Sequence, residues 1–346
     1  MARVSLEDID KVTRGCLASV GVSDSSIDII LETIHYANRR GVPTHGVGRL
    51  PLYVKKIKVG HFAADAPIDT VTDFGAMAVL DGNNGFGQTV AYRAMEIAIS
   101  KAKEFGVSIV GVRNSNNFGT AGYFGNMAAE AGMAAIIFAN AAPAIAPTGG
   151  TKAIFGTNPM CYAFPGGKKY DSVILDMATT IVARGKIRLA AKTGEKIPMT
   201  WAVDAGGNPT DDPNEALKGT LLPIAGYKGY GISAFVDLFA GLLTGSASTG
   251  GVKPLSNMAE NSGNGHLFIV IDVSRFMTDD ELTEKMSEFY ETVKSCGEEG
   301  TVLLPGERGF IQMKKNVDSV EISDKQLQEI NALAESLGID ALLKEI

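Results

Sequence analysis

Between residues 76 and 139 the chain alternates short apolar runs with glycine-rich turns and one long helical stripe. The runs at 76–81, 107–112 and 134–139 have the length and composition of buried strands. The segment 88–105 separates the first two, and small apolar residues recur in it at helical spacing: Ala91, Ala94, Met95, Ala98 and Ala102. This order of strand, loop, helix and strand predicts an α/β domain. A continuous apolar run at 266–273 predicts a further strand that is buried on both faces.

The two ends of the chain are predicted to be helical. Two apolar stripes at helical spacing fill the first forty residues, and Gly41 with Pro43 ends the second helix. Pairs with the spacing of N-terminal capping boxes begin further helices: Ser5 with Asp8, Thr278 with Glu281, and Ser323 with Gln326. The ends are therefore expected to form one helical lobe together.

A polar, turn-rich stretch at 65–76 marks the expected boundary between this lobe and the middle of the chain. We expect residues 1–75 and 275–346 to form the helical, substrate-side lobe. Residues 76–274 are then the α/β domain that holds a cofactor.

Charge and cysteine content exclude several classes of protein. The net charge of −7, without any basic block, argues against nucleic-acid binding. The three cysteines are too far apart for a disulfide framework or a metal site. The first residues lack the apolar core expected of a signal peptide, and the longest weakly polar run, 131–147, is too short to cross a membrane. We therefore expect a cytoplasmic protein with no metal and no membrane partner.

The segment Pro43–Leu50 places a hydroxyl, an imidazole and a guanidinium within six residues: Thr44, His45 and Arg49. Histidine transfers protons near neutral pH, and arginine holds a carboxylate through two parallel hydrogen bonds. This combination suits an enzyme that acts on a small anionic carboxylic acid. A surface turn is the simpler alternative, but only His45 of the four histidines has such neighbours.

Two glycine-rich turns follow predicted strands. Gly82, Gly85 and Gly87 reverse the glycine spacing of the dinucleotide-binding fingerprint, so a tight turn is the simpler interpretation. The turn at 114–122 leads into a helix, whose free backbone N–H groups can bind a phosphate. A capping loop that binds nothing is the alternative for this second turn.

Asp176 ends an apolar strand, and a buried carboxylate needs a partner. Arg184 and Lys186 follow closely, so they are expected either to pair with Asp176 or to face a bound anion. Lys228 stands between glycines at a helix start, where a phosphate can approach the backbone.

Seven short blocks in one order resemble the type-2 malate/L-lactate dehydrogenase family, which includes malate, sulfolactate and ureidoglycolate dehydrogenases. The blocks are THGVGRL, SNNFGTAGY, GTNP, LDMATT, ARGKI, GYKGYG and LPGER. The resemblance covers residues 5 to 310 and implies an α/β fold with a mixed sheet that is not of the Rossmann type. It also implies a nicotinamide cofactor, NAD or NADP, a 2-hydroxy or 2-oxo acid substrate, and a homodimer. Of the two cofactors, we expect NAD.

The resemblance also implies roles for individual residues. His45 is similar to the family's proton donor, Thr44 stands where a serine is usual, and Arg49 resembles the clamp for the substrate carboxylate. Asn117, Thr157 and Arg184 fall on the substrate side. Segments that resemble cofactor contacts are Gly119, Thr120, Ala121, Gly122, Tyr123, Leu175, Asp176, Met177, Lys228, Gly229, Pro305, Gly306 and Glu307.

Asn117 departs from the family pattern, because many members have histidine at this position. Asparagine forms hydrogen bonds but cannot relay a proton near neutral pH. This argues against ureidoglycolate oxidation through that residue and leaves His45 as the single imidazole of the motifs.

The working hypothesis is therefore hydride transfer between a nicotinamide and C2 of a small 2-oxo acid. Protonated His45 gives its proton to the alkoxide, while Thr44 or Asp176 orients the ring. Reduction of a cyclic imino acid, such as piperideine-2-carboxylate, is the second hypothesis, although Lys186 stands where that branch has an acid. A protein that binds the cofactor without turnover is the third.

Overall fold

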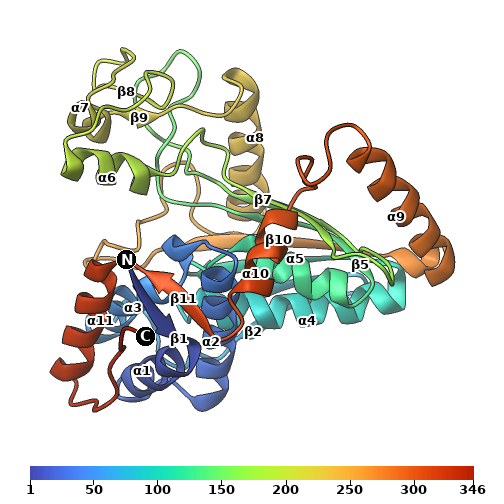
Figure 1. The fold of residues 1–346 in the computed structure, drawn as a ribbon, viewed down its shortest axis with the longest axis horizontal. Helices are drawn as coiled ribbons and strands as arrows, with labels where there is room; N and C mark the ends of the chain where they lie inside the picture. Colours follow the sequence, from blue (N-terminus) through green and yellow to red (C-terminus); the bar gives the residue numbers. More distant parts are fainter.

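The computed structural model describes residues 1–346 and is built around one mixed sheet of seven strands (Figure 1). Only β3 and β4 run parallel, and every other neighbouring pair is antiparallel. In spatial order the strands are β2 (Asp69–Phe74), β3 (Met77–Asp81), β4 (Val107–Ser115), β10 (Asn264–Asp272), β5 (Met133–Ala139), β6 (Met160–Phe164) and β7 (Val173–Met177). The expected mixed α/β fold is thus confirmed.

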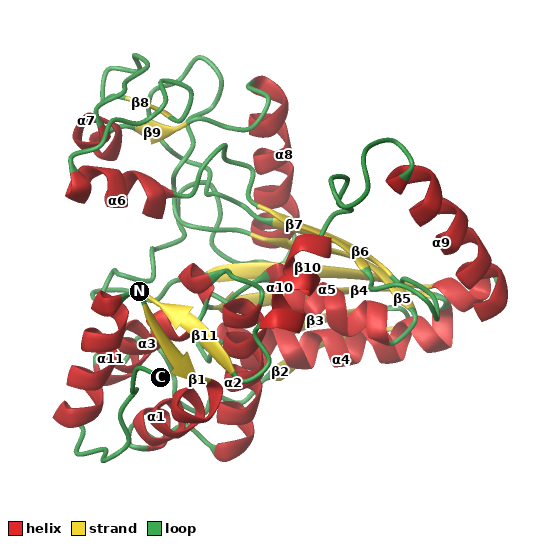
Figure 2. Ribbon diagram, in the orientation of Figure 1, coloured by secondary structure: helices red, strands yellow, loops and turns green.

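Two helices, α4 (Gly87–Phe105) and α5 (Ala121–Glu130), cover one face of this sheet (Figure 2). The alanine stripe of α4 is fully buried against β4 and β10, as its spacing predicts. Small residues also bring α5 close to β6, because a Cβ on Gly125 would lie 2.7 Å from the sulfur of Cys161. This packing fixes the N-terminus of α5 at the edge of the sheet near β7.

Both chain ends form one lobe, as expected, but it is not purely helical. Its helices are α1 (Leu6–Ala18), α2 (Asp24–Arg39), α3 (Leu50–Lys58) and α11 (Asp324–Ser336). Strands β1 (Ala2–Ser5) and β11 (Ser319–Ile322) pair antiparallel between them and tie the two ends together. One cluster of buried apolar side chains forms the core of this lobe, and its members come from both chain ends, the first being Val4 and the last Leu343.

A further small lobe stands on the other side of the sheet's β7 edge, at the top of Figure 1. It has its own apolar cluster, which includes Ile145, Ile187 and Leu221. Its elements are α6 (Arg184–Thr193), β8 (Ala202–Val203), α7 (Pro213–Lys218) and β9 (Thr220–Leu221). Helix α8 (Tyr227–Asp237) follows in the chain and continues into a π-helical turn at Leu238–Leu242. This lobe is not predicted from the sequence, where residues 76–274 are expected to form one domain.

Two helices in the C-terminal third of the chain pack against different parts of the structure. Helix α9 (Asp279–Lys294) packs through Leu282, Met286 and Tyr290 near the sheet, whereas α10 (Glu307–Lys315) lies against α2. The capping boxes that begin α9 and α11 are both formed, as predicted, and Ser5 caps α1 through the amide of Asp8. The two-part division at residues 75 and 275 stays a prediction.

The polar stretch at 65–76, taken as a boundary, contains the edge strand β2. All six side chains of β2 are exposed. The segment therefore lacks the alternation of apolar and polar residues from which a strand is predicted. No helix of the chain is long and apolar enough to span a membrane.

Candidate active site

His45 lies in a 3₁₀ turn, Pro43–His45, directly after the end of α2. The Oγ1 of Thr44 lies 3.0 Å from Nδ1 of the ring, so a hydroxyl orients the imidazole. This contact leaves Nε2 without a partner in the chain. The orienting role considered for Asp176 is filled by Thr44, because Asp176 forms its hydrogen bond elsewhere.

Arg49 ends the next 3₁₀ turn, Val47–Arg49, and points one edge of its guanidinium back at the same segment. Its Nε donates to the carbonyl of Thr44 at 2.6 Å, while the two terminal nitrogens form no hydrogen bond within the chain. A guanidinium held by Nε presents its fork of terminal N–H groups to a carboxylate. The spacing of the motif thus brings an imidazole and a guanidinium with free terminal nitrogens together.

The two glycines of this motif lie in close contact with side chains of neighbouring helices. A Cβ on Gly46 would lie 1.5 Å from Oδ1 of Asn38, which accepts a hydrogen bond from the amide of Val47 at 3.3 Å. A Cβ on Gly48 would lie 2.2 Å from the side-chain nitrogen of Gln326. The motif is therefore pressed against α2 and α11 and has a defined conformation.

The environment of His45 favours the neutral imidazole. His45 as a residue is partly exposed, but the protein surrounds its imidazole closely. Burial, with a smaller contribution from the Arg49 charge, lowers the pKa of His45 to about 4. At neutral pH the ring of the free protein is thus a proton acceptor, whereas the sequence-based hypothesis has it protonated.

The other three histidines each contact a side chain outside the Pro43–Leu50 motif. The ring of His35 contacts Asp10, and His61 contacts Asn261. His266 is fully buried and stacks on Phe118, with ring centroids 4.5 Å apart.

A second wall of the site forms where β7 meets the N-terminus of α5. The Oδ2 of Asp176 accepts a hydrogen bond from the amide of Gly122 at 2.8 Å, and a Cβ on Gly122 would lie only 3.0 Å from the same oxygen. Neither Arg184 nor Lys186 pairs with Asp176, so the pairing alternative is wrong, whereas the alternative that they face a bound anion stays a prediction. Asp176 is exposed at the end of β7, so the expectation of a buried carboxylate is wrong. The protein atoms packed around its carboxyl group still raise its pKa by desolvation, while the Gly122 amide and the charge of Arg40 oppose the rise.

Tyr36 joins the two walls. This residue of α2 donates from its hydroxyl to the carbonyl of Gly122 at 2.9 Å. Helix α2 therefore leads into the His45 segment at its end and, through Tyr36, contacts the residue whose amide binds Asp176.

The start of α5 presents unused backbone donors. The amides of Thr120 and Ala121 form no hydrogen bond within the chain, and the buried Oγ1 of Thr120 also has no partner. Gly119 has a φ of +83°, which a residue with a side chain rarely adopts. Asn117 accepts from the amide of Gly119 at 3.3 Å and shapes this turn. These free donors fit a dinucleotide phosphate, and the adjacent Asp176 fits a hydroxyl or amide donor of the same cofactor.

The turn at Thr157 and the start of α8 meet beyond the end of β7. Thr179 donates from its amide and its hydroxyl to the carbonyl of Thr157, each at 2.9 Å, and its own carbonyl accepts from Ile224. Gly229 packs on Ile224, where a Cβ would lie 2.0 Å from the carbonyl oxygen. The exposed Lys228 is thereby carried to the end of β7.

Several residues with implied binding roles are held by other contacts. Arg184 donates to the carbonyls of Leu217 and Gly219, at the end of α7. Glu307 binds Lys294 at 2.5 Å and accepts from the amide of Leu304. Leu175 points to the opposite face of the sheet from its neighbours Ile174 and Asp176, because strand side chains alternate.

Two further residues, Tyr53 and Arg40, lie near the site and are not predicted from the sequence. Tyr53 is fully buried one helical turn after Arg49, whose charge acts on it, and its hydroxyl accepts from Gln88 at 2.8 Å. Its position four residues after Arg49 is a signal that was present in the sequence. Arg40, at the end of α2, is the second, and only the tertiary structure shows its neighbours.

The family model described as malate/L-lactate dehydrogenase matches residues 4–331. The chain is 41% identical over 345 residues to the L-sulfolactate dehydrogenase of Methanothermobacter thermautotrophicus, covering 99% of this chain and 100% of the relative.

Solved structures agree in fold. The sulfolactate dehydrogenase of Methanocaldococcus jannaschii superposes with a TM-score of 0.91 at 37% identity and 98% coverage of both chains. The delta1-piperideine-2-carboxylate reductase of Pseudomonas syringae superposes with a TM-score of 0.86 at 27% identity, covering 96% of this chain and all of that one.

Proposed function

Since the chain belongs to the malate/L-lactate dehydrogenase family, we propose that it oxidises and re-forms small 2-hydroxy acids of the malate, lactate or sulfolactate type. The observation that carries this proposal is the pairing of a neutral, oriented His45 with the free guanidinium fork of Arg49. A 2-hydroxy acid needs both groups, because its C1 carboxylate must be held while the C2 hydroxyl loses a proton.

In the oxidation direction, Arg49 binds the substrate carboxylate and Nε2 of His45 takes the proton from the C2 hydroxyl. Thr44 holds the ring at Nδ1, so that Nε2 faces the substrate. Acceptance of the hydride from C2 is the chemistry that a bound nicotinamide would supply. In the reduction direction, the same nitrogen returns the proton to the oxygen at C2. Lys228 and the first turn of α5 bind the phosphates, and Asp176 binds a hydroxyl or amide of the cofactor.

A panel of substrates tests this function. Pyruvate, oxaloacetate, sulfopyruvate and piperideine-2-carboxylate are supplied with reduced cofactor, and loss of its absorbance is followed. We expect turnover with one or more 2-oxo acids. Turnover of the cyclic imine alone would overturn the proposal and favour the second candidate, imine reduction. That candidate is supported by the likeness to the piperideine-carboxylate reductase, and Arg49 would hold its carboxylate equally well.

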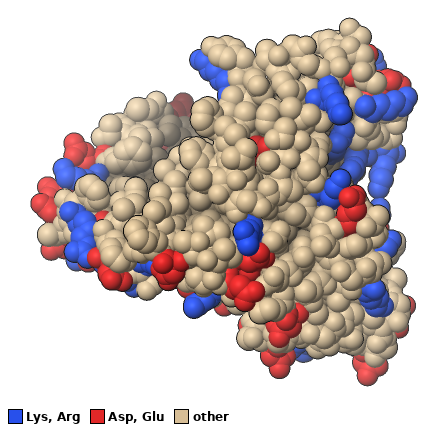
Figure 3. All heavy atoms as spheres, turned by 180° about the vertical axis from the view of Figure 1, so that it is seen from behind, with Lys and Arg blue, Asp and Glu red and all other residues tan.

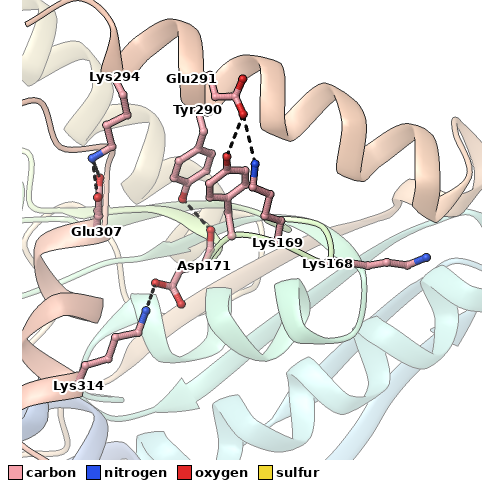
Figure 4. A pocket seen from close by; sticks show the side chains of 9 residues that line it. Lys168, Lys169, Asp171, Tyr290, Glu291, Lys294, Glu307 and Lys314 are labelled. Atoms are coloured by element: carbon pink, nitrogen blue, oxygen red, sulfur yellow. Dashed lines mark hydrogen bonds and ion pairs between the residues drawn. The ribbon is translucent and has the colours of Figure 1, made fainter. Parts of the chain in front are cut away.

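We propose NAD rather than NADP as the cofactor. A cavity of about 490 Å³ lies beside Glu307, and Figure 4 shows its lysines and acids from α9, α10 and the loop at 168–171. Every lysine there is paired with a carboxylate at 2.5–3.2 Å: Lys168 with Asp280, Lys169 with Glu291, Lys294 with Glu307, and Lys314 with Asp171. Because these charges are already neutralised, the cavity offers little net attraction to a 2′-phosphate.

Glu291→Gln is expected to improve the use of NADP, because it releases the positive charge of Lys169. We expect KM for NADP to fall several-fold while KM for NAD is unchanged, as measured by initial rates with each cofactor. Glu288→Gln, on the same helix but outside the cavity, is the matched control. An equal response of both cofactors to Glu291→Gln would contradict this role for the cavity.

We also propose a homodimer formed through the second face of the large sheet. Apolar side chains on this face are 37–47% exposed although they belong to central and edge strands: Met77, Val107, Ile109, Tyr162, Phe164 and Leu175. The face continues into a groove of about 500 Å³ beside α8, lined by Phe138, Tyr162 and Phe235 among others. The view from behind shows a broad area with few charged side chains (Figure 3). Exposed apolar surface of this extent is typical of an interface between subunits.

Phe235→Glu is expected to dissociate this dimer, because a charge would be buried in the interface. The mass measured by light scattering should fall to that of one chain. Phe235 is 62% exposed in the single chain, so the variant should fold. Phe276→Glu, at a 74% exposed site after β10, should leave the mass unchanged. A wild-type chain that is monomeric at micromolar concentration would refute the interface.

A further inference from the structure

Two side chains hold the segment that carries His45 and Arg49, and they come from opposite ends of the sequence. Asn38 lies in α2 and Gln326 in α11, and each packs against one glycine of the segment. Val47, two positions after His45 and two before Arg49, is fully buried in the core of the same lobe. The segment is therefore anchored at its middle, and its two functional residues stand on either side of the anchor.

Asn38 holds the segment from the side of α2. Its Oδ1 accepts a hydrogen bond from the amide of Val47 at 3.3 Å, and a Cβ on Gly46 would lie 1.5 Å from the same oxygen. The Nδ2 of Asn38 is buried and has no hydrogen-bond partner in the chain. A buried donor without a partner costs stability, so an apolar side chain would suit this position better if packing were its only role. The amide therefore contributes its acceptor oxygen to the segment at a cost to the fold.

Gln326 holds the segment from the side of α11. Its Oε1 accepts from the amide of Ser323 at 3.0 Å and from the hydroxyl of Ser323 at 3.1 Å, so the capping box of the helix fixes the side chain. The Nε2 at the other end of the same amide packs on Gly48, where a Cβ would lie 2.2 Å away. Gly48 directly precedes Arg49. The last helix of the chain therefore forms a second wall against the segment.

The functional groups are tied to this segment rather than to the rest of the lobe. The Oγ1 of Thr44 contacts the imidazole of His45, and the Nε of Arg49 donates to the carbonyl of Thr44. Neither the imidazole nor the guanidinium forms a further hydrogen bond within the chain. The placement of both groups therefore depends on how the backbone of the segment is held against its two neighbouring helices.

We propose that Asn38 and Gln326 are positioning residues of the active site, which hold segment 44–49 from two sides and so set where the His45 imidazole and the Arg49 fork meet the substrate. This inference rests on the proposed function, in which these two groups act on a 2-hydroxy acid. Misplacement of a reacting group by about 1 Å can lower a rate by about 100-fold. Asn38→Ala and Gln326→Ala are therefore each expected to lower kcat/KM by about 10-fold to 100-fold, through both a lower kcat and a higher KM for the acid.

Each variant has a matched control that removes a similar contact elsewhere. Asn316→Ala removes another buried amide at the end of α2, whose Nδ2 donates to the carbonyl of Arg39 at 3.0 Å. Glu281→Ala removes the equivalent capping box from α9. Loss of either capping box should lower Tm by about 2 °C, and the two asparagine variants should also resemble each other in Tm. Only the variants at Asn38 and Gln326 should change kcat and KM.

The decisive measurement repeats Asn38→Ala and Gln326→Ala in the His45→Ala background, by initial rates with saturating NADH. A residue that positions His45 should lose its effect on kcat there, whereas one that only stabilises the fold should lower kcat by the same factor in both backgrounds. Gln326→Glu keeps the capping acceptor and the volume against Gly48, so it should stay close to the wild type.

Wild-type kcat/KM in either alanine variant would overturn the inference, since both walls are needed to hold the segment. The same conclusion would follow from an undiminished effect on kcat in the His45→Ala background. Failure of the wild type to turn over any 2-oxo acid would instead refute the proposed function.

Discussion

Replacing His45 by alanine is expected to lower turnover by about 100-fold to 10,000-fold, because the reaction loses its only positioned proton acceptor. The effect should appear in kcat with saturating cofactor and substrate, while the dissociation constant of NADH stays close to that of the wild type. Thr44→Ser keeps the hydroxyl next to Nδ1 and should stay close to wild-type activity, whereas Thr44→Val should lose a part of it. Near-normal turnover in His45→Ala would remove this residue from the mechanism.

The proposed role of His45 also predicts how kcat/KM depends on pH in each reaction direction. Because the pKa of His45 is about 4 in the free protein, kcat/KM for oxidation should stay flat through the neutral range and fall only as the pH approaches 4. Reduction needs the protonated ring, so its kcat/KM should decline as the pH rises above that value. His45→Ala should lose both dependences. A wild-type oxidation profile with its acidic limb near pH 6.5 would show that the ring is not desolvated.

Replacing Arg49 by alanine is expected to lower kcat/KM by about 10-fold to 100-fold, the range for loss of hydrogen bonds between charged groups. The loss should fall mainly on KM for the acid, since the terminal nitrogens of Arg49 are the free ones. Arg49→Lys keeps the charge but not the fork, and should recover only a part of the affinity.

Because Arg49 also binds the carbonyl of Thr44, its loss could disturb His45. The split between kcat and KM separates the two effects, since disturbance of the base lowers kcat. Unchanged KM values for every 2-oxo acid in Arg49→Ala would contradict the clamp.

Local periodicity predicts the central strands and α4 within a few residues, because each buries its own apolar pattern. It does not predict β1, β2 or β11. These strands are four to six residues long, and β2 has no buried side chain, so pairing with a distant segment defines them rather than their own composition. The lobe of α6 and α7 is missed for a similar reason, since its small core is assembled from segments far apart in the chain.

The sequence by itself determined the constellation of Thr44, His45 and Arg49. All three lie within six residues after a helix end, so their proximity follows from local backbone geometry and from glycines that permit close packing. Only the tertiary structure decided the partners of Asp176. Its contacts come from the amide of Gly122 and the charge of Arg40, not from the nearby Arg184, which caps α7 instead. Sequence spacing specifies which groups can meet within one turn, whereas the packing of α2, α5 and β7 selects which distant groups do.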